Sequence, residues 1–242
     1  MGPQSDVFLQ NEGFCCICEA STTFVARGPW LRDQYLCGRC GTIPRARAVV
    51  EILNYVAPGW RSGAVHESSP VTDHLARKCP NYSFSFFYGD VPLGATKDGN
   101  RCENLEELTF KDNSFDVFIT QDVMEHVCRP DRALAEVMRV LRPRGVHVFT
   151  APKHQHLPKS IPRVSIADGR LTYLLPPEYH GNPIDAKGSL VTWDYGIDFE
   201  VLIQDWSGYC TSTYTIRDRE RGIDGEYLEV FVTRKASVNR RS

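Results

Sequence analysis

Long apolar runs are missing from this sequence of 242 residues. No segment approaches the roughly 20 apolar residues that a membrane-spanning helix needs. An excess of either charge is also missing: the formal net charge is -2, which disfavours nucleic acid and anionic membranes as partners. The first ten residues, MGPQSDVFLQ, have neither the basic nor the apolar region of a secretory signal. These absences predict a cytoplasmic protein without a membrane partner and leave its oligomeric state open.

The composition is that of an ordinary globular protein, with 42% hydrophobic and 24% charged residues. The length suits one sizeable domain with a small appendage. Neither an internal repeat nor a low-complexity tract interrupts it, so the remaining signals are local motifs.

Nine cysteines stand out against this background. Cys15 and Cys18 are followed, after 18 residues, by Cys37 and Cys40, which is the spacing of a two-knuckle zinc ribbon. Two knuckles can complete a tetrahedron of thiolates around Zn²⁺. A redox dithiol and scattered free thiols remain alternatives, and Cys16 could replace Cys15 as a ligand. The isolated cysteines are expected to be buried thiols: Cys79, Cys102, Cys128 and Cys210.

Strand and helix patterns alternate after the knuckles, which predicts a mostly parallel sheet with helices on both faces. Hydrophobic spacing predicts helices at 44–57, 71–80, 132–141 and 198–209 and strands at 63–70, 82–90, 114–120 and 145–152. The final pattern, 211–234, predicts two strands around a Gly-rich turn. Residues 151–195 interrupt the alternation with many Pro, Gly, His and Tyr, and an insertion this long predicts a lid or binding loop.

One central stretch carries a resemblance to a known family. In ENLEELTFKDNSFDVF, Asn104, Leu108, Phe110 and the following residues match a pattern like D-x-x-x-L-P-F-x-D-x-S-F-D. The match continues at EHV, residues 125–127, and at Glu136, Arg139-Val140-Leu141, Arg142-Pro143 and Gly145. The chain resembles the class I S-adenosylmethionine-dependent methyltransferases of the type 11-like kind, over about residues 60–235. The knuckles with CGTIPRAR, and YHGNP at 179–183, resemble a branch with a small zinc-binding segment before the core.

The resemblance implies a Rossmann-like, seven-stranded, mostly parallel sheet that ends in an antiparallel hairpin. It divides the chain into a zinc-binding segment at 1–43, a methyltransferase domain at 44–236 with its insertion at about 151–195, and a tail at 237–242. Ligands of such sheets lie beyond the carboxyl ends of the strands.

The resemblance also implies a site for S-adenosylmethionine. Glu67 takes the place of an acidic residue near the methionine moiety, Asp90 that of the ribose-binding acid, and Asn104 that of an adenine-contacting Asp. Helix capping for Glu67 and a turn role for Asp90 are the alternatives. Ser68, Ser69 and Pro70 stand where the family has glycines. The predicted cofactor-binding residues are Glu67, Ser68, Asp90, Asn104, Leu105 and Gln121.

An oxygen or nitrogen acceptor can need a base to remove its proton, and histidines are natural candidates. His180 and then His154 are the predicted base or substrate contacts, and Asp122, at a strand end, is predicted to line the site. His126 is expected to pack against the sheet. Basic residues at a helix start oppose the helix dipole, so Arg45 and Arg47 are expected to face an anion of the cofactor or substrate.

The resulting hypothesis is methyl transfer from S-adenosylmethionine to an oxygen or nitrogen atom of a small molecule, with a sugar or secondary metabolite as candidate acceptors and a structural zinc ion. One alternative is a protein of the same fold that binds the cofactor but catalyses another reaction, such as cyclisation, or none. Another is a zinc-ribbon nucleic-acid module joined to a methyltransferase, which the few basic residues around the knuckles disfavour.

Overall fold

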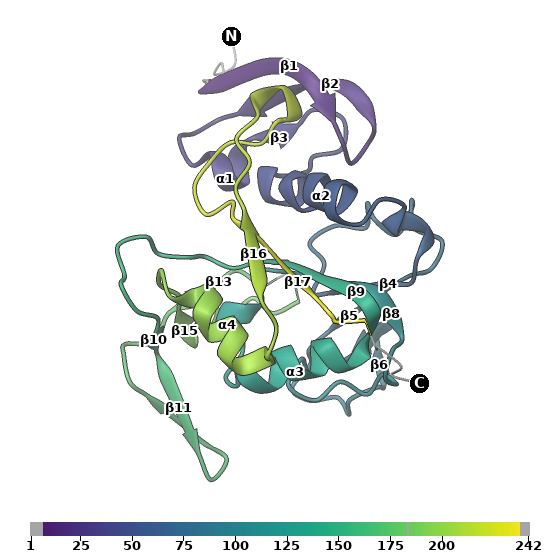
Figure 1. The fold of residues 1–242 in the computed structure, drawn as a ribbon. Coiled ribbons are helices and arrows are strands. Elements are labelled where there is room, and N and C mark those ends of the chain that lie inside the picture. Colours follow the sequence, from purple (N-terminus) through teal and green to yellow (C-terminus); the bar gives the residue numbers. More distant parts are fainter. Residues whose placement is uncertain (1–6, 183, 238–242) are drawn as a thin grey trace.

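A central sheet of eight strands organises the protein, a computed structural model of which describes residues 7–182 and 184–237 (Figure 1). Five parallel strands form its middle, and antiparallel strands flank them on both sides. In spatial order the strands are β16 (Thr211–Tyr214), β17 (Val230–Arg234), β9 (Leu141–Thr150), β8 (Phe115–Gln121), β4 (Val65–Ser68), β5 (Tyr82–Phe86), β7 (Asn100–Cys102) and β6 (Thr96–Lys97).

The mostly parallel sheet with an antiparallel terminal hairpin is confirmed, but the count of seven strands is wrong. The eighth strand, β6, has two residues and turns back on β7 at the sheet edge. Its polar pair Thr96 and Lys97 carries no apolar pattern that would predict a strand. The middle strands β4 and β8 are almost wholly buried, because helices and loops cover both faces of a parallel sheet.

Helices cover the two faces of the sheet as predicted. Helix α2 (Pro44–Val56) starts with Pro at its first position and packs Val49 and Leu53 into a core with residues from one face of the sheet. Helices α3 (Pro130–Val140) and α4 (Phe199–Ser207) pack into a second core with the other face. Short 3₁₀ turns lie at η1 (Trp60–Ser62), η2 (Met124–His126) and η3 (Arg219–Arg221).

The helix predicted at 71–80 does not form; this segment consists of turns. One of these turns closes where the amides of Lys78 and Cys79 donate to the carbonyl of Leu75 at 3.0 Å. Leu75 and Cys79 are the two apolar side chains that the segment buries. Two anchors are too few to offset the cost of starting a helix, which most helices recover by packing a longer apolar face.

The N-terminal segment forms a small three-stranded antiparallel sheet above α2 (Figure 1). Its strands are β1 (Leu9–Cys15), β2 (Ala20–Ala26) and β3 (Leu36–Cys37), and the one-turn helix α1 (Leu31–Gln34) precedes β3. Its buried residues share one hydrophobic core with α2 and the sheet face that α2 covers. The division of the chain at residue 43 therefore stays a prediction, since one apolar core crosses it.

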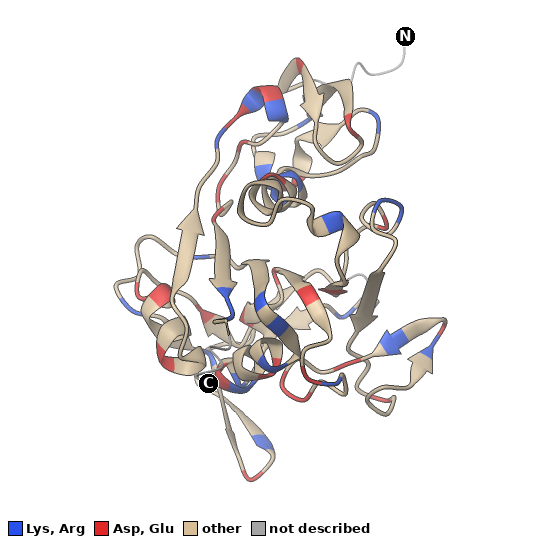
Figure 2. Ribbon diagram, turned by 45° about the vertical axis from the view of Figure 1, so that its right-hand side comes forward, with Lys and Arg blue, Asp and Glu red and all other residues tan. Residues whose placement is uncertain are grey.

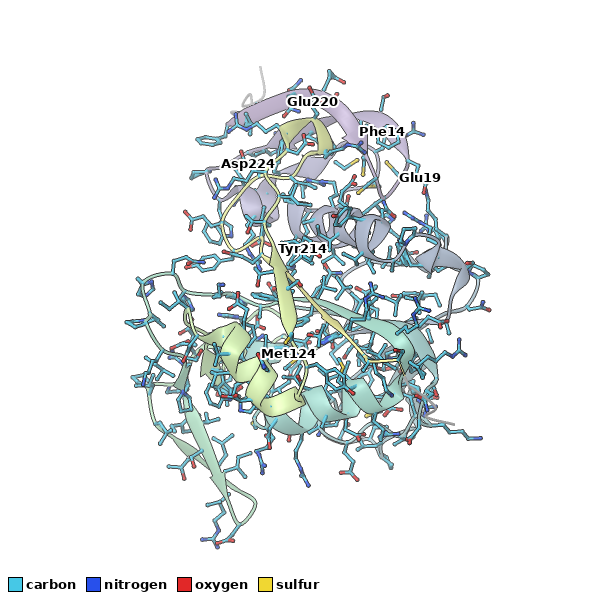
Figure 3. The ribbon with its side chains drawn as sticks, in the orientation of Figure 1. Phe14, Glu19, Met124, Tyr214, Glu220 and Asp224 are labelled. Carbon is cyan, nitrogen blue, oxygen red and sulfur yellow. The ribbon has the colours of Figure 1, made fainter. Side chains whose placement is uncertain are left out.

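The Gly-rich turn expected between the last two strands is wrong. Residues 215–229 instead leave the end of β16 and reach the N-terminal sheet before returning as β17, and Figure 3 shows Glu220 and Asp224 at the level of that sheet. This segment packs so closely against the N-terminal sheet that position 222 has room only for glycine. Gly222 has a φ of +65°, and a Cβ there would lie 2.4 Å from a ring carbon of Phe24. A side chain at that position would thus push this segment off the N-terminal sheet.

Arg47 of α2 links the N-terminal sheet to the 215–229 segment. Its guanidinium is buried and donates to the carbonyls of Gly222, at 2.5 and 3.0 Å, of Tyr35, at 2.6 Å, and of Thr42. The side chain also lies against the ring of Phe24, 4.8 Å from its centroid. The expectation that Arg47 faces an anionic ligand is wrong, because backbone carbonyls of the protein itself use its donors.

The insertion at 151–195 is built from short strands rather than a structureless loop. They are β10 (Ile161–Pro162), β11 (Val164–Ala167), β12 (Arg170–Tyr173), β13 (Tyr179–His180), β14 (Ser189–Leu190) and β15 (Trp193–Asp194), paired as β10 with β15, β11 with β12, and β13 with β14. The β11–β12 hairpin projects from the body (Figure 1). Pro183 of the YHGNP element, and residues 238–242 of the expected tail, lie outside the described residues.

Lys and Arg are interspersed with Asp and Glu along the described chain, as Figure 2 shows. Among the described residues, no helix is both long and apolar enough to span a membrane.

Candidate active site and metal centre

A cavity of about 1350 Å³ lies where the parallel strands β4, β5 and β8 end. Residues from the loops after these strands form one wall, and the insertion forms another. Trp30, Arg32 and Arg45 close it from the side of the N-terminal segment, and Tyr227 does so from the 215–229 segment. The cavity therefore stands at the sheet edge where open α/β sheets bind ligands.

Five of the six residues predicted to bind the cofactor line this cavity: Ser68, Asp90, Asn104, Leu105 and Gln121. Asp90 is exposed and pairs with Lys97 at 2.8 and 3.0 Å, which holds the pKa of its carboxyl below its ordinary value. The side-chain oxygen of Asn104 accepts from the amide of Glu106 at 3.0 Å, which fixes the orientation of the Asn104 amide group. These contacts present polar groups of known orientation to the cavity.

Glu67 lies one residue removed from the cavity lining. Its buried carboxylate accepts from Tyr82 Oη at 2.7 Å and from Gln121 Nε2 at 2.8 Å. Burial raises the pKa of Glu67 to about 7, while the two donors act in the opposite direction. Glu67 thus orients Gln121, and Gln121 is the residue that lines the cavity.

The turn after β4 keeps a glycine-like backbone without glycine. Ser69 has a φ of +54°, in the left-handed region where a side chain costs roughly 1 kcal/mol. Its amide donates to the carbonyl of Ser85 at 2.8 Å, which holds the turn against β5. Ser69 therefore adopts a left-handed conformation that glycine would adopt without this cost.

Asp122 is clasped by two arginines from the N-terminal half of the chain. Arg45 donates to its Oδ2 at 2.6 Å, and Arg32 donates to the same oxygen. Thr150 Oγ1 donates to the other oxygen at 2.7 Å. Burial opposes its ionisation, but Arg45 and Arg32 hold the pKa of Asp122 below its ordinary value. Arg45 does face a carboxylate, as expected, but this carboxylate is the protein's own. We call Arg32, Arg45 and Asp122 the clasp.

Four histidines line the cavity, and they include both predicted base candidates, His154 and His180. Burial lowers the pKa of His154, so its neutral form is favoured. The ring of His126 lies 5.4 Å from that of His180, and its Nδ1 is 2.9 Å from the carbonyl oxygen of Leu190. His126, expected to pack against the sheet, lines the cavity instead.

Glu125 is a cavity residue that the sequence reasoning missed. It is 2% exposed, and neither oxygen of its carboxylate has a hydrogen-bond partner in the part of the chain that the structure describes. Burial, together with the nearby charge of Asp122, raises its pKa well above the ordinary value. The sequence signal was available, because an acidic residue next to histidine just past a strand end is chemically unusual, but it was interpreted only as part of a family motif.

The four knuckle cysteines converge as a metal site requires. The distance between Sγ atoms is 3.8 Å for Cys15 and Cys40 and 3.9 Å for Cys18 and Cys37. Four sulfurs arranged tetrahedrally at about 2.3 Å from Zn²⁺ are about 3.8 Å apart, so the arrangement fits zinc. Cys16 points elsewhere, since its Sγ lies 3.5 Å from the carbonyl oxygen of Arg47.

Comparisons with known proteins agree with this geometry. Residues 91–149 match the model of a methyltransferase domain family. A methyltransferase from Mesorhizobium loti, described as S-adenosylmethionine-dependent, superposes with a TM-score of 0.51 at 15% identity, covering 78% of this chain and 98% of that one. The chain has the fold of an S-adenosylmethionine-dependent methyltransferase.

Two further similarities give less information about this chain. A structure of the Haloferax volcanii Trm112 methyltransferase activator with a putative methyltransferase matches at a TM-score of 0.50 and 11% identity, covering 82% of this chain and 92% of that one. A glycine/sarcosine/dimethylglycine N-methyltransferase from Actinopolyspora halophila is 43% identical over 49 residues. That match spans 20% of this chain and 9% of the relative.

Proposed function

We propose that this protein transfers a methyl group from S-adenosylmethionine to an oxygen or nitrogen atom of a small molecule held in the cavity. One observation carries the proposal: the polar groups suited to the adenosyl part and the histidines suited to an acceptor line a single cavity at the sheet edge. The matched segment 91–149 contributes Asn104, Leu105 and Gln121 to that cavity.

The cofactor end of the cavity has the chemistry that a nucleoside requires. The carboxylate of Asp90 can accept hydrogen bonds from two ribose hydroxyls, and Leu105 offers an apolar wall to the adenine ring. Ser68 and Gln121 offer polar groups at the ends of β4 and β8. When bound, S-adenosylmethionine supplies an electrophilic methyl group on a sulfonium. The residues of the chain then orient the acceptor and exclude water.

The acceptor end is the histidine wall. His154, which is favoured in its neutral form, can accept a proton from an acceptor hydroxyl or amine, and His180 faces the same space from the insertion. Asp122 is a poor base, because both of its oxygens already accept hydrogen bonds from Arg32, Arg45 and Thr150. We therefore assign Asp122 to the clasp and keep His180 and His154 for contact with the acceptor.

We also propose that Cys15, Cys18, Cys37 and Cys40 bind one structural zinc ion. The ion would hold β1, β2 and β3 in place, and these elements carry Arg32 and α2 against Asp122. A short segment with few apolar residues gains most of its stability from such a cross-link. Metal analysis of the purified protein should give about one zinc per chain from this site, and its absence would refute the assignment.

The rival function is cofactor binding with a reaction other than methyl transfer, which the serines after β4 keep open. Calorimetry with S-adenosylmethionine tests whether the protein binds the cofactor at all, which both functions require. Asp90→Asn should weaken binding about tenfold or more, because hydrogen bonds to a charged acceptor contribute about 1.5–3 kcal/mol. Asp98→Asn, on the same loop region but outside the cavity lining, is the matched control. S-adenosylhomocysteine as product indicates methyl transfer, whereas methylthioadenosine indicates cyclisation.

A further inference from the structure

Three potential metal ligands meet at the acceptor end of the cavity. Glu125 and His126 belong to η2, which follows β8, and His180 belongs to β13 of the insertion. One ligand atom from each residue lies within 4.8 Å of the other two. This cluster is separate from the four cysteines and has a different chemistry, with imidazole and carboxylate in place of thiolate.

The carboxylate of Glu125 makes no hydrogen bond among the described residues. Both of its carboxylate oxygens are buried and lack a hydrogen-bond partner, although Glu125 lines the cavity. A buried carboxylate without partners is costly, and buried acids are usually paired with a cation or bound to a metal. The Nε2 atom of His126 lies 3.9 Å from Glu125 Oε1, which is too far for a hydrogen bond.

His126 is held in the orientation of a ligand. Its Nδ1 lies 2.9 Å from the carbonyl oxygen of Leu190, and a carbonyl can only accept, so Nδ1 carries the proton. Nε2 then keeps its lone pair, and this is the atom that faces Glu125. A backbone carbonyl that fixes the free nitrogen of a metal-bound histidine is a common partner at metal sites.

The β13–β14 hairpin brings the third ligand. His180 pairs with Ser189, and the neighbouring Leu190 pairs with Tyr179 while accepting from His126. Two residues on, the amide of Thr192 donates to the carbonyl of Glu125 at 2.7 Å. The hairpin and the residues that follow it thus hold the ring of His126, the strand that carries His180 and the backbone of Glu125 beside one another, which argues for a built site over a chance encounter.

We propose that Glu125, His126 and His180 bind a divalent transition metal ion of the zinc type. Two histidines and one carboxylate leave coordination positions open, as in catalytic metal sites. The donors must approach one another by about 1 Å, since ligands at about 2.0–2.2 Å from one ion are closer together than 4.8 Å. His180 is half-buried on a two-residue strand, and metal binding would replace the present contact of its Nε2 with Glu178 Oε1, at 3.4 Å.

The role of the ion rests on the proposed function. An acceptor hydroxyl bound at an open position would become more acidic and lose its proton to His154. The oxygen–methyl bond would then form as the sulfur–methyl bond breaks, with the electron pair of that bond passing to sulfur. The acceptor would be a molecule with a hydroxyl that can reach the open position of the ion.

Cobalt titration of metal-free protein tests the site. We expect two Co²⁺ ions per chain: one with the near-ultraviolet charge-transfer band of thiolate ligands, and one with visible absorption but no thiolate band. His180→Ala and Glu125→Gln should raise the dissociation constant of the second ion by on the order of 100-fold or more, because even indirect ligand contacts cost 10–100-fold. His156→Ala, in the same cavity but outside the cluster, should keep both ions.

A single ion with only thiolate character, or a second ion that His180→Ala leaves unchanged, would overturn the site. Calorimetry with S-adenosylmethionine on the same samples separates this result from the proposed function. His180→Ala should bind the cofactor as the parent does, since His180 stands at the acceptor end. Loss of cobalt binding with cofactor binding retained therefore bears on the metal site alone, and a parent that binds two ions but no cofactor would refute only the function.

Discussion

The clasp offers the sharpest test of how the N-terminal segment is joined to the sheet edge. Asp122→Asn removes the charge and keeps the size of the side chain. It also suits the backbone, because Asp122 has a φ of +51° and Asn tolerates this left-handed conformation. Any loss of stability is then attributable to the ion pairs.

The expected loss is large because the clasp is mostly buried. The side chains of Arg32, Arg45 and Asp122 are 7, 9 and 16% exposed. Removing one partner of a buried pair costs about 3–5 kcal/mol, since the remaining charge stays desolvated. The amide oxygen of Asn can still accept from one arginine, which recovers about 1 kcal/mol. We therefore expect Asp122→Asn to lower the free energy of unfolding by about 3 kcal/mol.

Urea denaturation followed by tryptophan fluorescence measures this change as a lower midpoint at an unchanged slope. Asp98→Asn, an exposed residue with a similar φ of +52°, should change stability by less than about 0.5 kcal/mol. The effect should also depend on pH with a definite sign. The clasp depresses the pKa of Asp122, so its contribution is full above the ordinary Asp pKa and is lost as the pH falls below it. A loss equal to that of the control would refute the clasp as a structural link.

Two further predictions concern buried groups away from the cavity lining. Because burial raises the pKa of Glu67 to about 7, its protonated form favours folding, and the free energy of unfolding should fall as the pH rises from about 4.5 to about 7. In a pH series of urea melts, Glu67→Gln should remove this decline, which is on the order of 3 kcal/mol. A parallel decline in the variant would count against this prediction. Arg47→Lys should lower the free energy of unfolding by on the order of 3 kcal/mol, because an ammonium group cannot reach the three carbonyls that the planar guanidinium reaches. Arg221→Lys, at an exposed position of the 215–229 segment, should lower it by under about 0.5 kcal/mol. Equal urea midpoints for the two variants would show that Arg47 does not join these segments.

Local sequence patterns predicted the parts of the fold that depend on neighbouring residues in the chain. The alternation of strands and helices from Pro44 to Thr150 predicted a mostly parallel sheet with helices on both faces, because parallel strands need crossover connections, usually helices. The same patterns misjudged 71–80, where helical spacing was present but two buried side chains did not support a helix. Propensity is a weak signal once packing is missing.

The parts that escaped prediction depend on contacts between residues distant in the chain. Nothing near Arg47 announces that its partner is the carbonyl of Gly222, 175 residues away. The clasp likewise joins Arg32 to a residue 90 positions later. In the candidate site, the ends of strands located Asp90 and Gln121, but only the structure revealed that Glu125 lacks a partner, since burial without hydrogen bonds has no signature in a sequence.

The path of residues 215–229 bears on how the chain is made. Gly222, whose carbonyl accepts from Arg47 and which packs against Phe24, is synthesised 175 residues after Arg47, so β1, β2 and β3 are made long before their packing is complete. Until then, the N-terminal sheet has only part of its packing, and a metal ion held by the cysteine knuckles would help to keep it folded.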